Sequence, residues 1–474
     1  MRPERSRRCG LTALALLATA ALACEPSPAA TPPPSIVLVS LDTLRADHLT
    51  PYGYGRPTSP VLARFAAEAV RFDAAHAHAT ATLPSHLSLL TSLLPPQIGI
   101  TRPGPHHSQA STRLRLADPV VTLAEVLRDH GYHTAAFTDG GYVHPFYGFD
   151  QGFEHFSVTT IRQGAYRNGL RKSLGRLKEW LDGRDDPSAP VFLFLHTYDI
   201  HEPYSAPKPF DRAFTDLDYR GFRAERGFDA RPVELSRRRA ELTPQDVERA
   251  TGFYDNGVRA TDQALARLFA LLRERDLYEN ALIVVLSDHG EEFLDHGDFG
   301  HGPRVYQELA RVPLLIRLPG GAQAGRTIAA PVGLIDVAPS LLDLAGLPIP
   351  EDFTGHSLVG PMIGADEGEW LEQRPLYVDV PDVRSGAMAL RRGAWKLIRG
   401  GDAPELYQLD HDPGETRNLA AREGERVREL SAELDAWVAR MRETARAQGT
   451  LAVPSRETHP ADQEAALRAL GYLE

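Results

Sequence analysis

The sequence predicts an α/β protein with a large, mostly parallel central sheet flanked by helices, and a smaller C-terminal α+β subdomain. Continuous apolar runs at residues 35–41, 191–195 and 281–286 are typical of strands that are covered on both faces, as in a parallel sheet. Segments with helical patterns separate these runs, which favours alternating strands and helices. From about Leu376 the pattern changes to short strand-like segments followed by one long charged helix.

Boundary residues predict four helices in the large domain, because Ser, Thr and Pro favour helix starts and Gly favours helix ends. The expected helices run from Ser59-Pro60 to about residue 70, from about residue 84, over 120–130, and over 243–275. The last of these begins with Thr243-Pro-Gln-Asp246, in which the threonine is expected to cap the helix.

The smaller subdomain is expected to contain three short strands, a turn and a charged helix. These lie at residues 376–380, 387–391, 395–398, 412–415 and 423–447. The predicted organisation is therefore a large domain over 35–375 and a C-terminal subdomain over 376–474.

The N-terminus has the pattern of an export signal. Residues 1–23 combine four arginines with a short apolar segment and end in Ala-Leu-Ala, as signal peptides do before their cleavage site. The apolar segment is well short of the roughly 20 residues that a membrane-spanning helix needs. Residues 24–34 are rich in Pro and Ala and predict an extended tether.

Cys24 directly follows the predicted cleavage site. Small residues followed by Cys resemble a bacterial lipobox, so we expect an exported, periplasmic or cell-envelope lipoprotein that contacts the membrane only through a lipid on Cys24. The alternative is plain secretion, with Cys24 incidental. The other cysteine, Cys9, lies inside the signal, so no internal disulfide is expected in the mature chain.

The net charge of −11 argues against nucleic acid as a partner, because an acidic surface repels a phosphate backbone. A small anionic substrate remains compatible with this charge, since a bound metal reverses the local field.

Metal-ligand residues follow all three of the buried runs. Asp42 follows the first, His196, Asp199 and His201 follow the second, and Ser287-Asp288-His289-Gly290 follows the third. In open α/β sheets, functional groups gather at the carboxyl ends of the strands, so these side chains are expected to meet. One Asp after a strand is more often a turn or helix cap, but three clusters after three strands predict a site.

Six segments together resemble the sulfatase-like family of the alkaline phosphatase superfamily. They are SIVLVSLDTLRADHL (35–49), TLPSHLSLLT (82–91), SDHGE (287–291), GHG (300–302), YQELARVP (306–313) and ELYQLDHDPGE (405–415). The resemblance covers nearly the whole mature chain in order. It implies a metal-dependent ester hydrolase with a large α/β domain and a small C-terminal sheet domain.

The chain departs from true sulfatases at the nucleophile. They have Cys or Ser in a Cys/Ser-x-Pro-x-Arg motif that matures to formylglycine, whereas this chain has Thr82 and His86 at those places. The resemblance is therefore closer to members in which a threonine attacks phosphorus directly. A threonine hydroxyl is a weak nucleophile until a metal activates it.

The resemblance implies one or two divalent ions, and Zn, Mn, Ca and Mg are all compatible with the ligands. The first ion is assigned to Asp42, Thr82, Asp288 and His289. Asp199, His201 and His301 are candidates for a second ion. If no second ion binds, His201 and His301 become hydrogen-bond donors or the general acid for the leaving group.

The leading functional prediction is hydrolysis of phosphoric mono- or diesters through a covalent intermediate on Thr82. Sulfuric ester hydrolysis is the nearest alternative. A third is head-group transfer of the phosphoethanolamine or phosphoglycerol kind, although such transferases usually carry several spanning helices. The fourth is a non-catalytic envelope binding protein, which the intact nucleophile and ligand set disfavours.

Overall fold

The central strand of the large sheet is β1 (Ile36–Leu41), which pairs in parallel with β6 (Val191–Thr197) on one side and β7 (Leu282–Leu286) on the other. All three strands are buried along their length. The three apolar runs of the sequence are therefore neighbours, and their carboxyl ends lie at one edge of the sheet.

The computed structural model describes residues 33–99, 114–159, 169–215, 219, 232–237, 239–366, 368–380, 386–454, 459–470 and 472. The predicted signal peptide and most of the predicted tether lie outside the described residues. Among the described helices, none is both long and apolar enough to cross a membrane.

Further strands extend the sheet on both sides. The parallel strands β4 (His133–Thr138) and β5 (His155–Val158) lie beyond β6. Beyond β7, β10 (Arg311–Arg317) runs antiparallel and is followed by β2 (Val70–His76). The short strands β11 (Thr327–Ile328) and β12 (Val332–Gly333) pair with β2. The expected mostly parallel sheet is confirmed.

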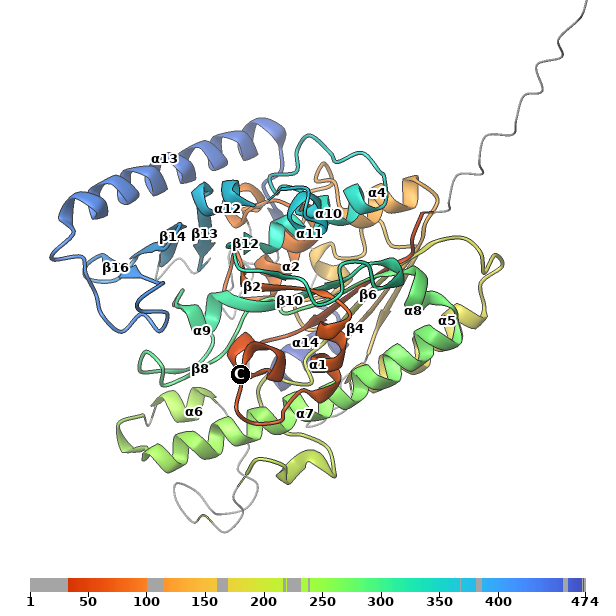
Figure 1. The fold of residues 1–474 in the computed structure, drawn as a ribbon, viewed down its shortest axis with the longest axis horizontal. Helices are drawn as coiled ribbons and strands as arrows, with labels where there is room; N and C mark the ends of the chain where they lie inside the picture. The colour runs from red at the N-terminus through yellow and green to blue at the C-terminus, as the bar shows by residue number, and fades with distance from the viewer. Residues whose placement is uncertain are drawn as a thin grey trace, which may run out of the picture. The chain divides into compact units, whose positions relative to one another are not determined.

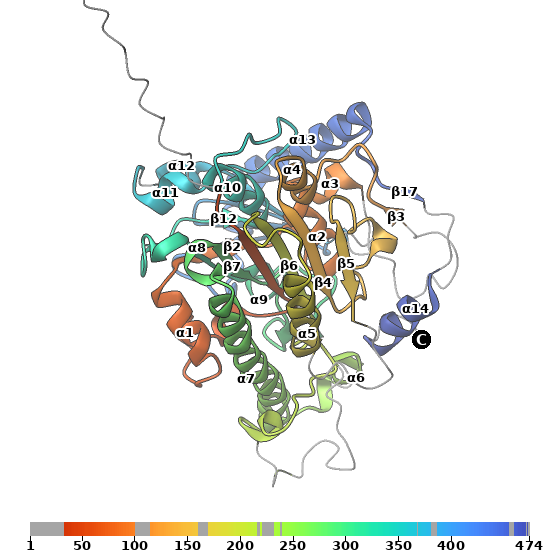
Figure 2. The same cartoon turned by 90° about the vertical axis from the view of Figure 1, so that its right-hand side faces the viewer.

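Helices cover both faces of this sheet, as Figures 1 and 2 show. On one face lie α2 (Thr82–Thr91), α4 (Leu123–Asp129) and α10 (Val337–Leu344), and on the other α1 (Pro60–Ala67), α5 (Gly169–Asp182) and α7 (Pro244–Glu274). Side chains of β1 alternate between the two apolar cores, with Leu38 facing the first set and Val39 the second.

The predicted helix starts agree closely with the structure. The side chain of Thr243 accepts a hydrogen bond from the backbone N–H of Asp246 and caps α7, as expected. Ser59 directly precedes α1, but its hydroxyl accepts from the N–H of Thr50 and does not cap the helix.

A four-stranded antiparallel sheet forms the smaller subdomain. Its strands are β13 (Leu376–Asp379), β14 (Met388–Arg392), β15 (Trp395–Arg399) and β16 (Glu405–Gln408). The long helix α13 (Gly424–Gln448) lies beside this sheet (Figure 1). Its residues Leu434 and Trp437 belong to one apolar cluster with Leu390 and Leu397 of the sheet. The expected C-terminal α+β subdomain is confirmed.

The segment after α13 does not stay with the small sheet, although the subdomain was expected to run to residue 474. Helix α14 (Ala461–Ala469) returns to the large domain, where Leu467 enters the main core and Leu470 packs against Tyr198. The reason is its apolar face, since Ala466, Leu467 and Leu470 are all buried there.

Candidate active site

The carboxyl ends of β1 and β7 hold two aspartates side by side. Asp42 follows β1, and Asp288 follows β7 after one residue. Thr43 joins them, because its backbone N–H lies 3.3 Å from Asp288 Oδ1 while its hydroxyl donates to the carbonyl of Asp42 at 2.7 Å. Thr43 has a φ of 58°, which is strained for a β-branched residue and is typical of functional loops.

Asp42, Asp288 and His289 form what we call the acidic cluster. Their ligand atoms lie within 4.8 Å of one another, and all three residues are fully buried. His289 Nδ1 lies 2.9 Å from the carbonyl of Gly290, which only accepts hydrogen bonds. The other nitrogen, Nε2, is therefore the one that offers a lone pair to the cluster.

The acidic cluster fits a divalent cation. Asp42 Oδ1 and Asp288 Oδ2 are buried and have no hydrogen-bond partner among the described residues. Burial, together with the charges of Asp288 and Glu291, raises the pKa of Asp42 well above its ordinary value. Two buried carboxylates are costly without a compensating positive charge, and carboxylate oxygens with one imidazole are suitable metal ligands.

Thr82 is the first residue of α2 and is buried beside the acidic cluster. Its hydroxyl oxygen lies 3.5 Å from Nε2 of His289. The first-turn N–H groups of a helix have no partners within the helix, so this position also favours an anionic substrate. The structure thus brings together Asp42, Thr82, Asp288 and His289, the four residues assigned to the first ion.

Two further histidines surround the cluster. His86 lies one turn along α2, where its Nδ1 is 2.9 Å from the carbonyl of Thr82 and its Nε2 is 2.8 Å from the hydroxyl of Ser40. His196, at the end of β6, places Nε2 3.1 Å from Asp42 Oδ2. Burial lowers the pKa of both imidazoles, which favours their neutral form.

With Asp42, these two histidines form a second group of metal-ligand type. Both nitrogens of His86 already have partners, so we regard it as a residue that orients the first turn of α2. The sequence did not identify this role for His86, although the four-residue spacing from Thr82 was a usable signal, since it puts both on one helix face.

The structure does not bring Asp199 to the other residues assigned to a second ion. Its two carboxylate oxygens accept hydrogen bonds from the N–H groups of Gly169 and Leu170, at 2.7 and 3.1 Å. These are the first two residues of α5, so Asp199 caps a helix. Asp199 therefore has the alternative role expected for a single Asp after a strand, that of a helix cap.

His201 and His301 do lie together, with their ring centroids 4.9 Å apart. Nδ1 of His301 is 3.0 Å from a carboxylate oxygen of Glu291, and Nδ1 of His201 is 2.7 Å from the carbonyl of Glu202. The ring of His301 is also 4.6 Å from that of His289. The pair therefore borders the acidic cluster, and its remaining nitrogens contact Tyr472, a residue the sequence had not singled out.

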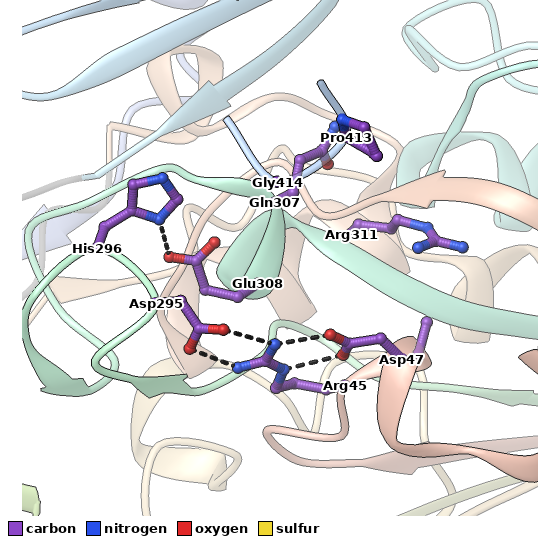
Figure 3. A pocket seen from close by; sticks show the side chains of 10 residues that line it. Arg45, Asp47, Asp295, His296, Gln307, Glu308, Arg311, Pro413 and Gly414 are labelled. Atoms are coloured by element: carbon purple, nitrogen blue, oxygen red, sulfur yellow. Dashed lines mark hydrogen bonds and ion pairs between the residues drawn. The ribbon is translucent and has the colours of Figure 1, made fainter. Parts of the chain in front are cut away.

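A pocket of about 120 Å³ lies next to this region (Figure 3). Arg45 lies between Asp47 and Asp295 and makes ion pairs of 2.7 and 2.8 Å with them. Arg45 also donates to the carbonyl of Glu291 at 2.9 Å. The described lining contains no member of the acidic cluster, so we assign to Arg45 a supporting role in fixing the loops behind the site.

Comparison with known proteins agrees with this geometry. The solved phosphonate monoester hydrolase of Agrobacterium radiobacter superposes with a TM-score of 0.68 at 21% identity, over 86% of this chain and 96% of that one. A protein solved in complex with its substrate, D-glucosamine-2-N,6-O-disulfate, superposes with a TM-score of 0.66 at 21% identity, over 86% and 98%. At these identities the likeness establishes the fold.

Sequence relatives include arylsulfatase K. The protein of Canis lupus familiaris is 30% identical over 195 residues, and that of Homo sapiens is 30% identical over 192. These matches cover 38% of this chain, and 36% and 35% of the two relatives. The chain therefore spans about a third of the length of these relatives.

Two family models match the chain. The model of the C-terminal region of N-sulphoglucosamine sulphohydrolase matches residues 295–444. The model of sulfatases matches residues 34–347, which is well over half of the chain and includes the acidic cluster, Thr82 and His301. The family expected from the sequence motifs is confirmed, and the chain belongs to the sulfatase family.

Proposed function

We propose that this chain is a metal-dependent ester hydrolase that cleaves phosphoric mono- or diesters through a covalent intermediate on Thr82. The observation that carries the proposal is a buried threonine at the start of α2, with its hydroxyl 3.5 Å from a nitrogen of the acidic cluster. The substrate is a small anionic ester. Its negative charge suits both a cation held by the cluster and the N-terminus of α2.

Asp42, Asp288 and His289 would hold the ion, with Thr82 beside it. A bound divalent ion acts as a Lewis acid, which lowers the pKa of hydroxyl groups and offsets charge on the substrate. Thr82 Oγ1 releases its proton to solvent and forms a bond to phosphorus while the bond from phosphorus to the leaving oxygen breaks. The leaving oxygen takes a proton from one of the two histidines on its side of the site, His301 or His201.

In the second step a water molecule attacks phosphorus and the bond from phosphorus to Thr82 breaks. The threonine hydroxyl is restored by a proton from that water, and the phosphoryl product leaves. His86 supports both steps by holding the carbonyl of Thr82 at 2.9 Å, which fixes the first turn of α2.

Threonine favours phosphorus over sulfur for a chemical reason. A formylglycine residue attacks sulfur as a hydrated aldehyde, and it expels sulfate when its second hydroxyl loses a proton, the aldehyde re-forms and the carbon–oxygen bond to sulfate breaks. Thr82 has no second oxygen on the reacting carbon, so it lacks this exit, and release must come from water attacking the transferred group. The second candidate remains sulfuric ester hydrolysis, which is favoured by the relatives named arylsulfatase K.

A panel of p-nitrophenyl phosphate, bis-p-nitrophenyl phosphate, a p-nitrophenyl phosphonate and p-nitrophenyl sulfate tests the proposal on metal-loaded protein. We expect kcat/KM to be far higher for the phosphate esters than for the sulfate ester. Thr82→Ala should lose several orders of magnitude, while Thr82→Ser should keep much of the rate, because the hydroxyl is the reacting group. Peptide mass analysis should find plain threonine at position 82.

Thr91→Ala is the matched control. Thr91 is the last residue of α2, is equally buried, and donates its hydroxyl to the carbonyl of Leu87 at 2.7 Å. Its replacement tests the loss of a buried threonine in the same helix away from the cluster, and kcat/KM should change little. A higher kcat/KM for the aryl sulfate than for the matching aryl phosphate would overturn the proposal.

A further inference from the structure

The hydroxyl of Tyr472 joins the two histidines at the border of the acidic cluster. It lies 2.9 Å from His201 Nε2 and 3.0 Å from His301 Nε2. Its ring packs edge-on against Tyr142, with centroids 4.6 Å apart. A residue far along the chain from both histidines thus contacts the two that border the metal-ligand residues.

Packing of the preceding helix fixes the place of Tyr472. Leu467 and Leu470 are each 1% exposed, and the buried amide of Gln463 donates to the carbonyl of Gly141. The backbone N–H of Tyr472 donates to the carbonyl of Leu467 at 2.9 Å. The tyrosine therefore follows directly from a segment that is built into the core of the large domain.

Hydrogen-bond roles around Tyr472 form one directed array. Nδ1 of His201 faces a carbonyl, which only accepts, so Nδ1 carries a hydrogen, and in the tautomer with this single hydrogen Nε2 accepts. The hydroxyl of Tyr472 accordingly donates to His201, and its oxygen is left to accept from Nε2–H of His301. Glu291 contacts the far nitrogen of His301 and completes the array.

Neither matching family model accounts for Tyr472, since both end at or before residue 444. Both histidines border the part of the site to which the proposed reaction assigns the leaving oxygen. Without the tyrosine hydroxyl, Nε2 of each ring loses its described partner, and the two rings lose the bridge between them.

We propose that Tyr472 is a positioning residue for the leaving-group side of the site, where its hydroxyl holds His201 and His301 in one array. This inference rests on the proposed ester hydrolysis. Tyr472→Phe keeps the aromatic ring and removes the hydroxyl that forms the bridge. Its loss should slow the step in which the leaving oxygen departs, and most strongly where that oxygen is weakly acidic.

The kinetic test compares Tyr472→Phe with wild type on p-nitrophenyl phosphate, which has a good leaving group, and on phenyl phosphate, which has a poorer one. We expect kcat on phenyl phosphate to fall by about tenfold, as for the loss of one well-placed hydrogen bond, with little change in KM. The fall on p-nitrophenyl phosphate should be much smaller. Equal rates to wild type on both substrates, or equal losses on both, would overturn the inference.

Leu434→Ala is the structural control, because Leu434 is a buried residue of the small subdomain core and does not belong to the segment that holds Tyr472. It should lower thermal stability and leave the ratio of kcat on the two substrates unchanged. If Leu434→Ala reproduced the leaving-group dependence of Tyr472→Phe, general destabilisation and not the hydroxyl would be the cause, and the inference would fail.

A measurement independent of turnover separates this inference from the proposed function. In protein labelled with ¹⁵N-histidine, and assigned with His201→Gln and His301→Gln, the Nε2 signals of both rings should shift on Tyr472→Phe. Unchanged signals would overturn the inference even in an active enzyme. If wild type hydrolyses none of the esters, the proposed function fails, and the spectra still decide whether Tyr472 bridges the histidines.

Discussion

At the scale of single residues, the structure places a buried acid, Asp139, close to a half-buried one, Asp199. Asp139 accepts hydrogen bonds from the hydroxyl of Thr197 and the N–H of Tyr198, at 2.7 and 3.0 Å. Burial and the nearby charge of Asp199 raise the pKa of Asp139 from 3.8 to about 7. Burial also raises the pKa of Asp199 to about 6. The contribution of the Asp199 cap of α5 to the free energy of unfolding therefore depends on pH.

The sign of this effect predicts the behaviour of Asp139→Asn. Between about pH 4 and pH 7 the folded protein keeps a proton on Asp139 that the unfolded chain has lost, so stability falls as the pH rises. Asparagine stays neutral and avoids this loss. Relative to wild type, the variant should therefore gain stability as the pH rises from 5 to 8.

Urea denaturation at the two pH values measures this gain. Asp118→Asn, which also removes one acid but at an exposed position, controls for the change in net charge. A stability difference between Asp139→Asn and wild type that is the same at pH 5 and pH 8 would contradict the assignment.

At the scale of secondary-structure elements, a buried ion pair connects the small sheet to the large domain. Lys396 of β15 lies 2.8 Å from Glu415 and donates to the carbonyl of Val305 at 2.6 Å. Glu415 in turn accepts from the N–H of Gln307 at 2.6 Å. Both ionic side chains are almost fully buried, so neither has water to replace its partner.

Lys396→Met should destabilise the protein by about 3–5 kcal/mol, because it leaves the Glu415 carboxylate buried and unpaired. Adding Glu415→Gln to this variant should recover part of the loss, since the second change removes the orphaned charge. Chemical denaturation of the two variants and wild type gives the comparison. A double variant no more stable than Lys396→Met would contradict the assignment of the ion pair between Lys396 and Glu415 as a link between the small sheet and the large domain.

Sequence reasoning located the elements well because their signals are local. The apolar runs gave β1, β6 and β7, and the capping sequence at Thr243 gave the start of α7. The rule that functional groups gather at strand ends then brought Asp42 and Asp288 together. Each of these inferences needed only a few neighbouring residues.

The parts that sequence reasoning missed depend on distant contacts. Asp199 precedes His201 by two residues, a spacing that suits metal ligands, but its carboxylate caps α5, which lies earlier in the chain. Tyr472 reaches His201 and His301 only because α14 packs on the large domain. No local sequence pattern predicts either contact.

At the scale of the whole molecule, the acidic cluster links metal binding to folding stability. A ligand that binds only the folded state stabilises it by about 2.7 kcal/mol at a free concentration of one hundred times its Kd. Adding a divalent ion to chelator-treated protein should therefore raise the Tm, and Asp288→Asn should reduce that rise. Differential scanning calorimetry on both proteins measures it.

Asp295→Asn provides the comparison for this experiment. Asp295 is an acid paired with Arg45 and lies outside the acidic cluster, so the variant should keep the metal-dependent rise in Tm. A wild-type Tm that does not change between chelator and saturating metal would count against a metal at Asp42, Asp288 and His289.

The central place of β1 has a consequence for synthesis on the ribosome. This strand emerges first among the described elements, but its neighbours β6 and β7 follow only at residues 191–197 and 282–286. A growing chain therefore carries an apolar strand with at least one open edge until more than half of its residues have been made. Unpaired apolar edges recruit other strands, so chains interrupted before Leu286 are exposed to aggregation, and protection of the growing chain until β7 is made favours the native sheet.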